Sequence, residues 1–141
     1  MSFKENGECE KMNILFVCTG NTCRSPMAEA ICRVKYPNRH AGSAGLVAHI
    51  PLPATDDAVE AVALYGGDLS EHLSRQVSAE MLEEAEIVVP MAQAHAERLR
   101  ELFPQFSHKL RLLGEVADPF GGDAEDYRLC AELISELLDS L

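Results

Sequence analysis

Residues 13–34 read NILFVCTGNTCRSPMAEAICRV, and they combine the patterns of a strand, a loop and a helix. Its first five residues, NILFV, form an apolar run that is typical of a buried parallel strand. Pro26 suits the first turn of a helix. The apolar residues that follow recur at helical spacing: Met27, Ala30, Ile31 and Val34. The eight residues between strand and helix, CTGNTCRS (18–25), therefore form a loop at the carboxyl end of the strand and the amino end of the helix.

The rest of the chain repeats this alternation of strand and helix. We expect further strands at 40–44, 86–91 and 109–113, and helices after an N-cap at Thr55, over 92–103 and over 124–138. The last helix carries an apolar stripe of Tyr127, Cys130, Ile134, Leu137 and Leu141. Alternation of this kind predicts an α/β fold with a parallel sheet.

The composition suits one domain, since the chain has 141 residues of which 47 % are hydrophobic. We expect residues 12–141 to form that domain and the polar residues 1–11 to be a disordered tail without a secretory signal. The formal net charge of −11 disfavours nucleic acid and anionic membranes as partners. The five cysteines match no zinc-binding spacing and point to a reducing, cytoplasmic location without a bound metal.

The loop at 18–25 has the features of an anion site. A loop that leads into a helix directs backbone N–H groups at whatever lies above it, and the helix dipole adds positive potential. Gly20 allows a tight turn, and Arg24 offers a planar fork of donors that matches two phosphate oxygens. A second loop, DPFGG at 118–122, follows the last expected strand and should reach the same edge of the sheet, where ligands of such sheets bind.

Cys18, the first residue of the loop, is the candidate nucleophile. The positive field that favours an anion also favours a thiolate. A cysteine six residues before an arginine combines a nucleophile with an oxyanion clamp, which suits attack on a phosphoryl group through a phosphocysteine intermediate. Alone, Cys18 would be interpreted as a buried core cysteine in an ordinary turn; its combination with Gly20, Asn21, Arg24 and Ser25 favours catalysis. The nucleotide-binding pattern GxxxxGK[ST] is absent.

The string CTGNTCRSPMAEA (18–30) resembles the active-site loop of the low-molecular-weight protein tyrosine phosphatase family, which has the pattern C-x5-R-[ST]. The resemblance runs from about Met12 to the C-terminus. It includes SAG (43–45), SEHLSRQ (70–76), AEIVVPM (85–91) and DPFGG (118–122), in the family's order. It implies a flavodoxin-like fold of four parallel strands with helices on both faces, and a two-step phosphatase that needs neither metal nor cofactor.

The resemblance also implies the roles of individual residues. Cys18 would be the nucleophile, Arg24 would clamp the phosphoryl group, and Asp118 would act first as general acid and then as general base. The loop residues Thr19, Gly20, Asn21, Thr22, Cys23 and Ser25 would surround the phosphate. Asn21, Ser25, Ser43 and His72 would support the loop, and Ser25 is best placed to hydrogen-bond the Cys18 thiolate.

Two features favour phosphoarginine as the substrate. The form of the loop with Thr22 resembles a bacterial branch of protein arginine phosphatases, whereas tyrosine phosphatases of the family usually carry an aliphatic residue there. Thr22 would offer a hydroxyl beside a P–N bond, although it could be a neutral substitution. The expected rim is also poor in the aromatic side chains that grip a phosphotyrosine ring: the chain has no Trp, and the stretch LVAHIPLPA (46–54) has no aromatic residue.

Three alternatives belong to other functions. An ordinary low-molecular-weight tyrosine phosphatase would use the same Cys18, Arg24 and Asp118. Arsenate reductases share this loop but need a late pair of cysteines, and only Cys130 follows Cys32. A phosphate-binding module without activity would be expected to lack Cys18, Arg24 or Asp118. We therefore expect an enzyme that acts on phosphorylated proteins, as a monomer.

The remaining cysteines and histidines raise one more possibility. Cys23 lies five residues after Cys18 in the same curled loop, so the two could form a reversible disulfide, or Cys23 could serve only for packing. Cys9, Cys32 and Cys130 are interpreted as tail or core residues, and His49, His95 and His108 as solvated.

Overall fold

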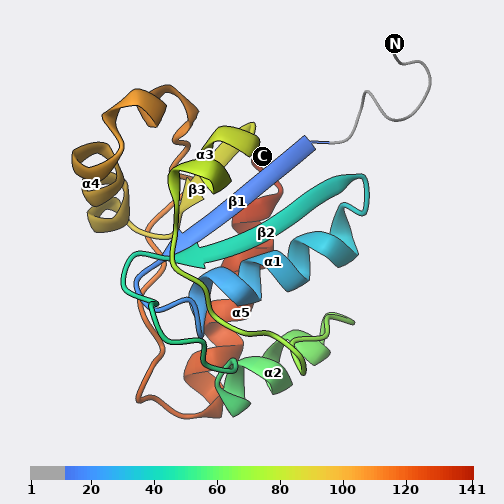
Figure 1. The fold of residues 1–141 in the computed structure, drawn as a ribbon. Coiled ribbons are helices and arrows are strands. Elements are labelled where there is room, and N and C mark those ends of the chain that lie inside the picture. Colours follow the sequence, from blue (N-terminus) through green and yellow to red (C-terminus); the bar gives the residue numbers. More distant parts are fainter. Residues whose placement is uncertain (1–11) are drawn as a thin grey trace.

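The computed structural model describes residues 12–141, so the tail expected at 1–11 lies outside the described residues. Figure 1 shows strands and helices alternating along this part of the chain. The elements are β1 (Met12–Cys18), α1 (Arg24–Lys35), β2 (Arg39–Gly45), α2 (Asp56–Ala63), α3 (Ala79–Glu84), β3 (Ile87–Pro90), α4 (Gln93–Leu102), a 3₁₀ helix η2 (Pro104–Lys109) and α5 (Ala124–Leu138). No helix within 12–141 has the length and apolar character needed to cross a bilayer.

The strands form a parallel sheet in the order β2-β1-β3, with β1 in the centre. Side chains of β1 alternate between the two faces, and both faces are covered. Ile14 and Phe16 belong to the core shared with α1, α2 and α5, while Leu15 and Val17 belong to the core under α3 and α4. This explains why NILFV is apolar at nearly every position rather than at alternate ones.

Among residues 12–141 the sheet has three strands, so the prediction of four parallel strands is wrong for the run at 109–113. That run lies beside β3, in parallel, but pairs with it only through an isolated bridge between Val88 and Leu110. The N–H of Arg111 donates to the carbonyl of Val88, and that of Val116 donates to Met91. Between these two bonds, the six residues 111–116 lie opposite the four residues 88–91, so the run bulges and no regular ladder forms.

Several predicted helix ends coincide with observed caps. The Thr55 side chain accepts a hydrogen bond from the N–H of Ala58 and begins α2. Helix α5 has the predicted bounds, and Asp123 and Asp126 close its first turn as a capping box. These local signals are strong because each satisfies backbone groups that the helix leaves unpaired.

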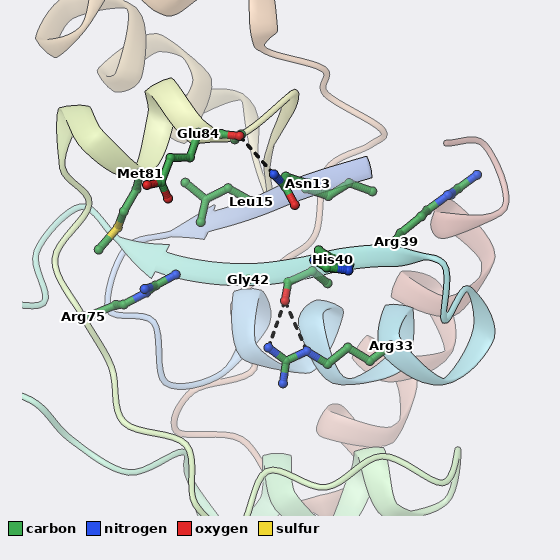
Figure 2. A pocket seen from close by; sticks show the side chains of 12 residues that line it. Asn13, Leu15, Arg33, Arg39, His40, Gly42, Arg75, Met81 and Glu84 are labelled. Atoms are coloured by element: carbon green, nitrogen blue, oxygen red, sulfur yellow. Dashed lines mark hydrogen bonds between the residues drawn. The ribbon is translucent and has the colours of Figure 1, made fainter. Parts of the chain in front are cut away.

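The edge strand β2 is capped by arginine side chains. Gly45 hydrogen-bonds outward to the segment at 75–77, so alternate residues of β2 point their carbonyls to this free edge. The carbonyl of Ala41 accepts from Nε and Nη2 of Arg33 at 3.2 and 2.9 Å, and that of Ser43 accepts from Nε of Arg75 at 2.9 Å. Figure 2 shows these guanidinium groups in a hollow of about 500 Å³ along the strand. Capping makes this edge a poor template for pairing with another strand.

A pair of leucines on α4 tests the core on the second face of the sheet. Leu99 is 1 % exposed, whereas Leu102, at the end of the same helix, is 42 % exposed. We predict that Leu99→Ala lowers the free energy of unfolding in urea by about 2–5 kcal/mol, because it removes buried methyl groups and leaves a cavity. Leu102→Ala, the matched control, should cost less than about 1 kcal/mol. Equal losses in the two variants would contradict the packing described here.

Candidate active site

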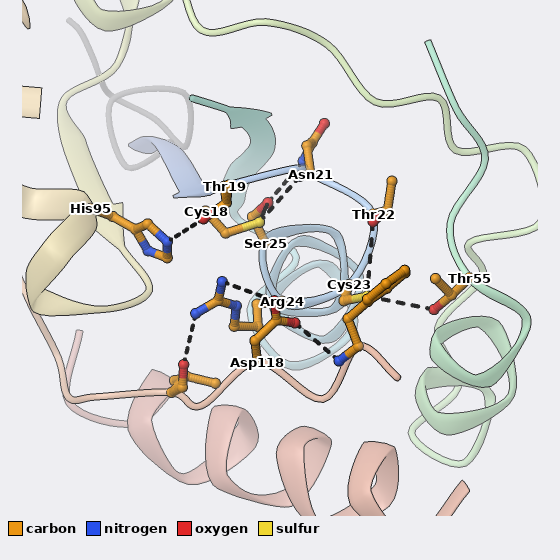
Figure 3. A network of polar contacts seen from close by, with 12 residues as sticks. Cys18, Thr19, Asn21, Thr22, Cys23, Arg24, Ser25, Thr55, His95 and Asp118 are labelled. Atoms are coloured by element: carbon orange, nitrogen blue, oxygen red, sulfur yellow. Dashed lines mark hydrogen bonds and ion pairs between the residues drawn. The ribbon is translucent and has the colours of Figure 1, made fainter. Parts of the chain in front are cut away.

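The loop at 18–25 lines a hollow of about 520 Å³ at the carboxyl edge of the sheet. The DPFGG loop contributes Asp118 and Phe120 to its wall, and the segment after β2 contributes Val47, Ile50 and Leu52. Figure 3 shows the loop curled above the first turn of α1, with Asp118 and His95 approaching from other elements. The two loops that sequence analysis expected at one edge of the sheet are therefore brought together.

Backbone geometry leaves the centre of the loop open to an anion. Helix α1 begins at Arg24 with no acidic residue in its first turn and no side-chain cap, so its amino end is not neutralised. The chain after β2 holds the start of the loop from the side: the N–H groups of Leu46 and Val47 donate to the carbonyls of Cys18 and Thr19. Gly45 permits this approach, because a Cβ there would lie 2.8 Å from the carbonyl oxygen of Thr19.

Asn21 holds the curl of the loop. It is fully buried and is the one non-glycine residue within 12–141 with a positive φ, at 59°. Its Nδ2 donates to the hydroxyls of Ser25 and Ser43 at 2.8 and 3.0 Å, and its Oδ1 accepts from the N–H of Arg75 at 3.0 Å. Its own carbonyl contacts Nε2 of His72 at 2.8 Å. Asparagine tolerates the left-handed backbone better than most residues, and here its side chain is also completely used.

The Cys18 sulfur lies between two donors. Sγ is 2.9 Å from the hydroxyl of Ser25 and 3.3 Å from the N–H of Asn21. The Ser25 oxygen accepts from Asn21, and its one hydrogen has two acceptors within reach, the Cys18 sulfur and, at 3.5 Å, the carbonyl of Ala44. The shorter contact favours donation to the sulfur. The geometry suits a thiolate, which can only accept hydrogen bonds.

Two residues that the sequence patterns did not indicate, Glu29 and Arg75, extend this support. The Ser43 hydroxyl donates to Glu29 Oε1 at 2.6 Å, and Glu29 pairs with Arg33 one helical turn later. Arg75 binds both Asn21 and the carbonyl of Ser43. Glu29 and Arg75 lie within the quoted motifs, but neither the helical pattern nor the spacing indicates that they reach the loop from outside. The predicted supporting residues Ser43 and His72 do lie against Asn21.

Arg24 connects the two loops of the site. It is buried, its Nη1 donates to the carbonyl of Val116 at 3.1 Å, and its Nη2 lies 3.5 Å from Oδ2 of Asp118. The Asp118 side chain is half exposed, and its Oδ1 accepts from the N–H of Phe120. A carboxylate held over the mouth of an anion site, beside the guanidinium, can exchange a proton with a group that leaves or enters there.

His95 corrects the sequence prediction, which placed it in solvent; His49 and His108 are exposed as expected. His95 is 5 % exposed and its Nε2 lies 3.0 Å from Oγ1 of Thr19 in the loop. Burial, and then the nearby guanidinium of Arg24, lower the pKa of His95 to about 4, so the ring is neutral at neutral pH. The pattern of α4 could not reveal this contact, because it depends on how the amino end of α4 packs beside the loop.

The other cysteines have different surroundings. Cys23 is buried, with its sulfur 3.4 Å from the Tyr127 hydroxyl and 3.7 Å from that of Thr55. Burial raises the pKa of the Cys130 thiol to about 12 and also raises that of Cys32, which suits core residues. Cys9 lies outside the described residues. Within 12–141, no cluster of three or more His, Cys, Asp or Glu side chains could hold a metal ion.

Two substitutions separate the roles of the Asn21 backbone and side chain. Asn21→Gly keeps the left-handed conformation but removes three side-chain hydrogen bonds. We predict a loss of about 3 kcal/mol in the free energy of unfolding for Asn21→Gly. Asn21→Ala should lose about 1 kcal/mol more, because alanine is strained at this φ. Urea titrations measure both, and losses below about 1 kcal/mol would show that the network does not hold the loop.

Comparison with known proteins agrees with this geometry. The family model described as low molecular weight phosphotyrosine protein phosphatase matches residues 13–141. A protein-arginine-phosphatase of Bacillus subtilis (strain 168) is 37 % identical over an alignment of 143 positions, which covers 92 % of this chain and 94 % of that protein.

Two solved structures share the fold. That of a low molecular weight protein tyrosine phosphatase from T. tengcongensis has a TM-score of 0.87 and 39 % identity, over 91 % of this chain and 95 % of that one. That of a cysteine-to-serine mutant of YwlE arginine phosphatase, with a phosphorylated active-site serine, has a TM-score of 0.84 and 36 % identity, over 90 % and 91 %. The family resemblance of the sequence is thus confirmed, and the chain belongs to the low molecular weight phosphotyrosine protein phosphatase family.

Proposed function

We propose that this protein is a protein arginine phosphatase that hydrolyses phosphoarginine through a phosphocysteine intermediate. The observation that carries the proposal is the convergence of Cys18, Arg24 and Asp118 on one hollow, with the threonine form of the loop in its wall. The Bacillus subtilis relative named a protein-arginine-phosphatase supports the choice of substrate.

The first step transfers the phosphoryl group to the enzyme. The Cys18 thiolate attacks phosphorus while Arg24 and the backbone N–H groups of the loop bind the phosphoryl oxygens. The P–N bond breaks as Asp118 gives its proton to the departing guanidine nitrogen. The Ser25 hydroxyl, 2.9 Å from the sulfur, holds the thiolate in position before attack.

The second step returns the enzyme to its starting state. Asp118, now a carboxylate, takes a proton from a water molecule that attacks the phosphocysteine, and the P–S bond breaks. Inorganic phosphate and the Cys18 thiolate are released. The structure of the YwlE arginine phosphatase mutant with a phosphorylated active-site serine supports a covalent intermediate at this position of the loop.

The choice of arginine rests on the walls of the hollow. Thr22 lines it, and within 12–141 the nearest hydrogen-bonding neighbour of its hydroxyl is the Cys23 sulfur at 3.9 Å. That hydroxyl is therefore free to contact a polar guanidine. The exposed Val47 and Ile50, at 67 % and 72 %, offer an apolar surface for the methylene stem of arginine.

A low-molecular-weight protein tyrosine phosphatase is the second candidate. Phe120 lines the hollow and is 68 % exposed, so its ring could pack on a phosphotyrosine ring. The relative from T. tengcongensis is named a tyrosine phosphatase. The arsenate reductase alternative is disfavoured, because Cys130 is a buried thiol with a pKa raised to about 12 by burial and is unsuited to relay a disulfide.

We also propose that oxidation of Cys18 regulates the enzyme reversibly. Peroxide would oxidise the Cys18 thiolate to a sulfenic acid with release of water. The Cys23 sulfur would then displace the sulfenic oxygen as water and form a disulfide, which an external thiol reduces.

The compartment, the partners and the oligomeric state belong to the same proposal. A reducing cytoplasmic compartment suits a nucleophile that must remain a thiolate. We expect phosphorylated proteins as partners and a monomeric enzyme.

Kinetics on two peptide substrates test the proposed specificity. We predict that kcat/KM for a phosphoarginine peptide exceeds that for the matched phosphotyrosine peptide by at least about tenfold, a difference in transition-state binding of about 1.4 kcal/mol. Thr22→Ile should reduce this preference, because the hydroxyl beside the P–N bond is lost. Cys18→Ser serves as the inactive control. A preference for phosphotyrosine in wild type and variant alike would identify a tyrosine phosphatase and make Thr22 a packing residue.

Intact-mass analysis after peroxide tests the disulfide. Wild-type protein should lose two hydrogens, lose activity, and regain activity with a thiol reductant. Cys23→Ala should instead proceed to irreversible sulfinic acid, while Cys130→Ala, the control for removal of a buried cysteine, should behave as wild type. Full thiol-dependent recovery of Cys23→Ala would rule out Cys23 as the resolving cysteine.

A further inference from the structure

His95 brings a third strand-to-helix junction, that between β3 and α4, to the site. It lies in the first turn of α4, just after β3, and Figure 3 shows its ring reaching toward Thr19 from the side opposite Thr55. The ring is 5 % exposed, and its Nε2 is 3.0 Å from Oγ1 of Thr19. The residue takes no part in the two-step mechanism above, yet it contacts the residue next to the nucleophile.

The second ring nitrogen decides the direction of this hydrogen bond. Nδ1 of His95 is buried and has no hydrogen-bond partner among residues 12–141. A neutral ring carries one proton. If that proton were on Nδ1, a buried N–H donor would be left unpaired, which is rarer and more costly than an unpaired acceptor. The proton therefore belongs on Nε2, and His95 donates to the Thr19 oxygen.

Donation by His95 leaves the Thr19 hydrogen without a partner in the described part of the chain. Thr19 is exposed and lines the hollow together with Cys18 and Arg24. We infer that His95 is a positioning residue that orients the Thr19 hydroxyl as a hydrogen-bond donor to the phosphate. This inference rests on the proposed function of the loop as a phosphate cradle, and it adds a phosphate ligand to the backbone N–H groups and Arg24.

The charges around His95 keep the ring in the form that this role requires. Arg24, on α1, opposes a second positive charge, whereas Glu115 and Asp118, on the segment before α5, favour one. Burial has the largest effect, and the pKa is lowered to about 4. The ring is accordingly neutral throughout the range above about pH 5, and its donation to Thr19 should not vary with pH there.

The inhibition constant for inorganic phosphate measures how tightly the loop binds phosphate when no leaving group is present. With p-nitrophenyl phosphate as the assay substrate, we predict that Thr19→Val and His95→Leu each raise the inhibition constant for phosphate about tenfold, as expected for one hydrogen bond to a charged group. The double variant should also show about tenfold, because the two residues act through one bond. His95→Gln, which keeps an N–H donor, should stay within about threefold of wild type.

The outcomes separate this inference from the proposed function. If phosphate does not inhibit the wild type, the phosphate cradle itself is wrong. If phosphate inhibits the wild type and the single variants alike, or if the two effects multiply to about a hundredfold in the double variant, the role of His95 is overturned while the cradle stands. Thr19→Val keeps the test valid should His95→Leu fold poorly, because Thr19 is exposed.

The pH dependence separates a neutral His95 donor from a protonated ring that binds phosphate directly. The ratio of the inhibition constants of His95→Leu and wild type should be constant from about pH 5.5 to 8, since a neutral ring does not titrate there. A ratio that grows as the pH falls through about 6.5 would mean that a protonated ring binds phosphate directly, and would overturn the inference.

Discussion

The loop at 18–25 is held in its curl by the buried, left-handed conformation of Asn21. A positive φ at this residue turns the chain between Cys18 and Arg24, and the Asn21 side chain ties that turn to Ser25, Ser43 and Arg75. Without the turn, the N–H groups of the loop and the amino end of α1 would not face one point. Because both polar groups of the side chain are hydrogen-bonded, a change in the conformation of the loop would break these bonds, and the curl of the loop is held without a ligand.

A strongly acidic protein has to create its anion site locally. The net charge of −11 opposes a phosphorylated ligand, and Arg24 is the one arginine or lysine among the residues that line the hollow. Attraction for a phosphate would therefore have to come from Arg24, short-range hydrogen bonds and the amino end of α1. His95 is suited to this site in its neutral form. A protonated ring beside Arg24 would be costly to bury, whereas a neutral N–H donor orients Thr19 at little cost.

Local patterns predicted the parts of the fold in which neighbouring residues determine the structure. The strand and helix around the loop, the N-cap at Thr55 and the bounds of α5 follow from apolar spacing and capping chemistry. The prediction of a regular fourth strand at 109–113 was wrong, because the bulge before Val116 arises from the way this segment packs beside β3. Sequence patterns placed Cys18, Arg24 and Asp118 at one edge of the sheet, but the contacts of Glu29, Arg75 and His95 depend on packing between distant elements and carry no local signal.

A direct test of the mechanism is to find the phosphoryl group on Cys18. Wild-type enzyme should carry the intermediate during turnover, because each phosphoryl group passes through Cys18 before water removes it. We would mix the enzyme with a phosphoarginine peptide, quench the reaction rapidly and map the modified residue by peptide mass spectrometry. We predict one phosphoryl group on the peptide that contains Cys18, and none on that peptide in Cys18→Ala, which has no nucleophile there. Turnover without a phosphorylated Cys18, or a phosphoryl group on another side chain, would contradict this mechanism.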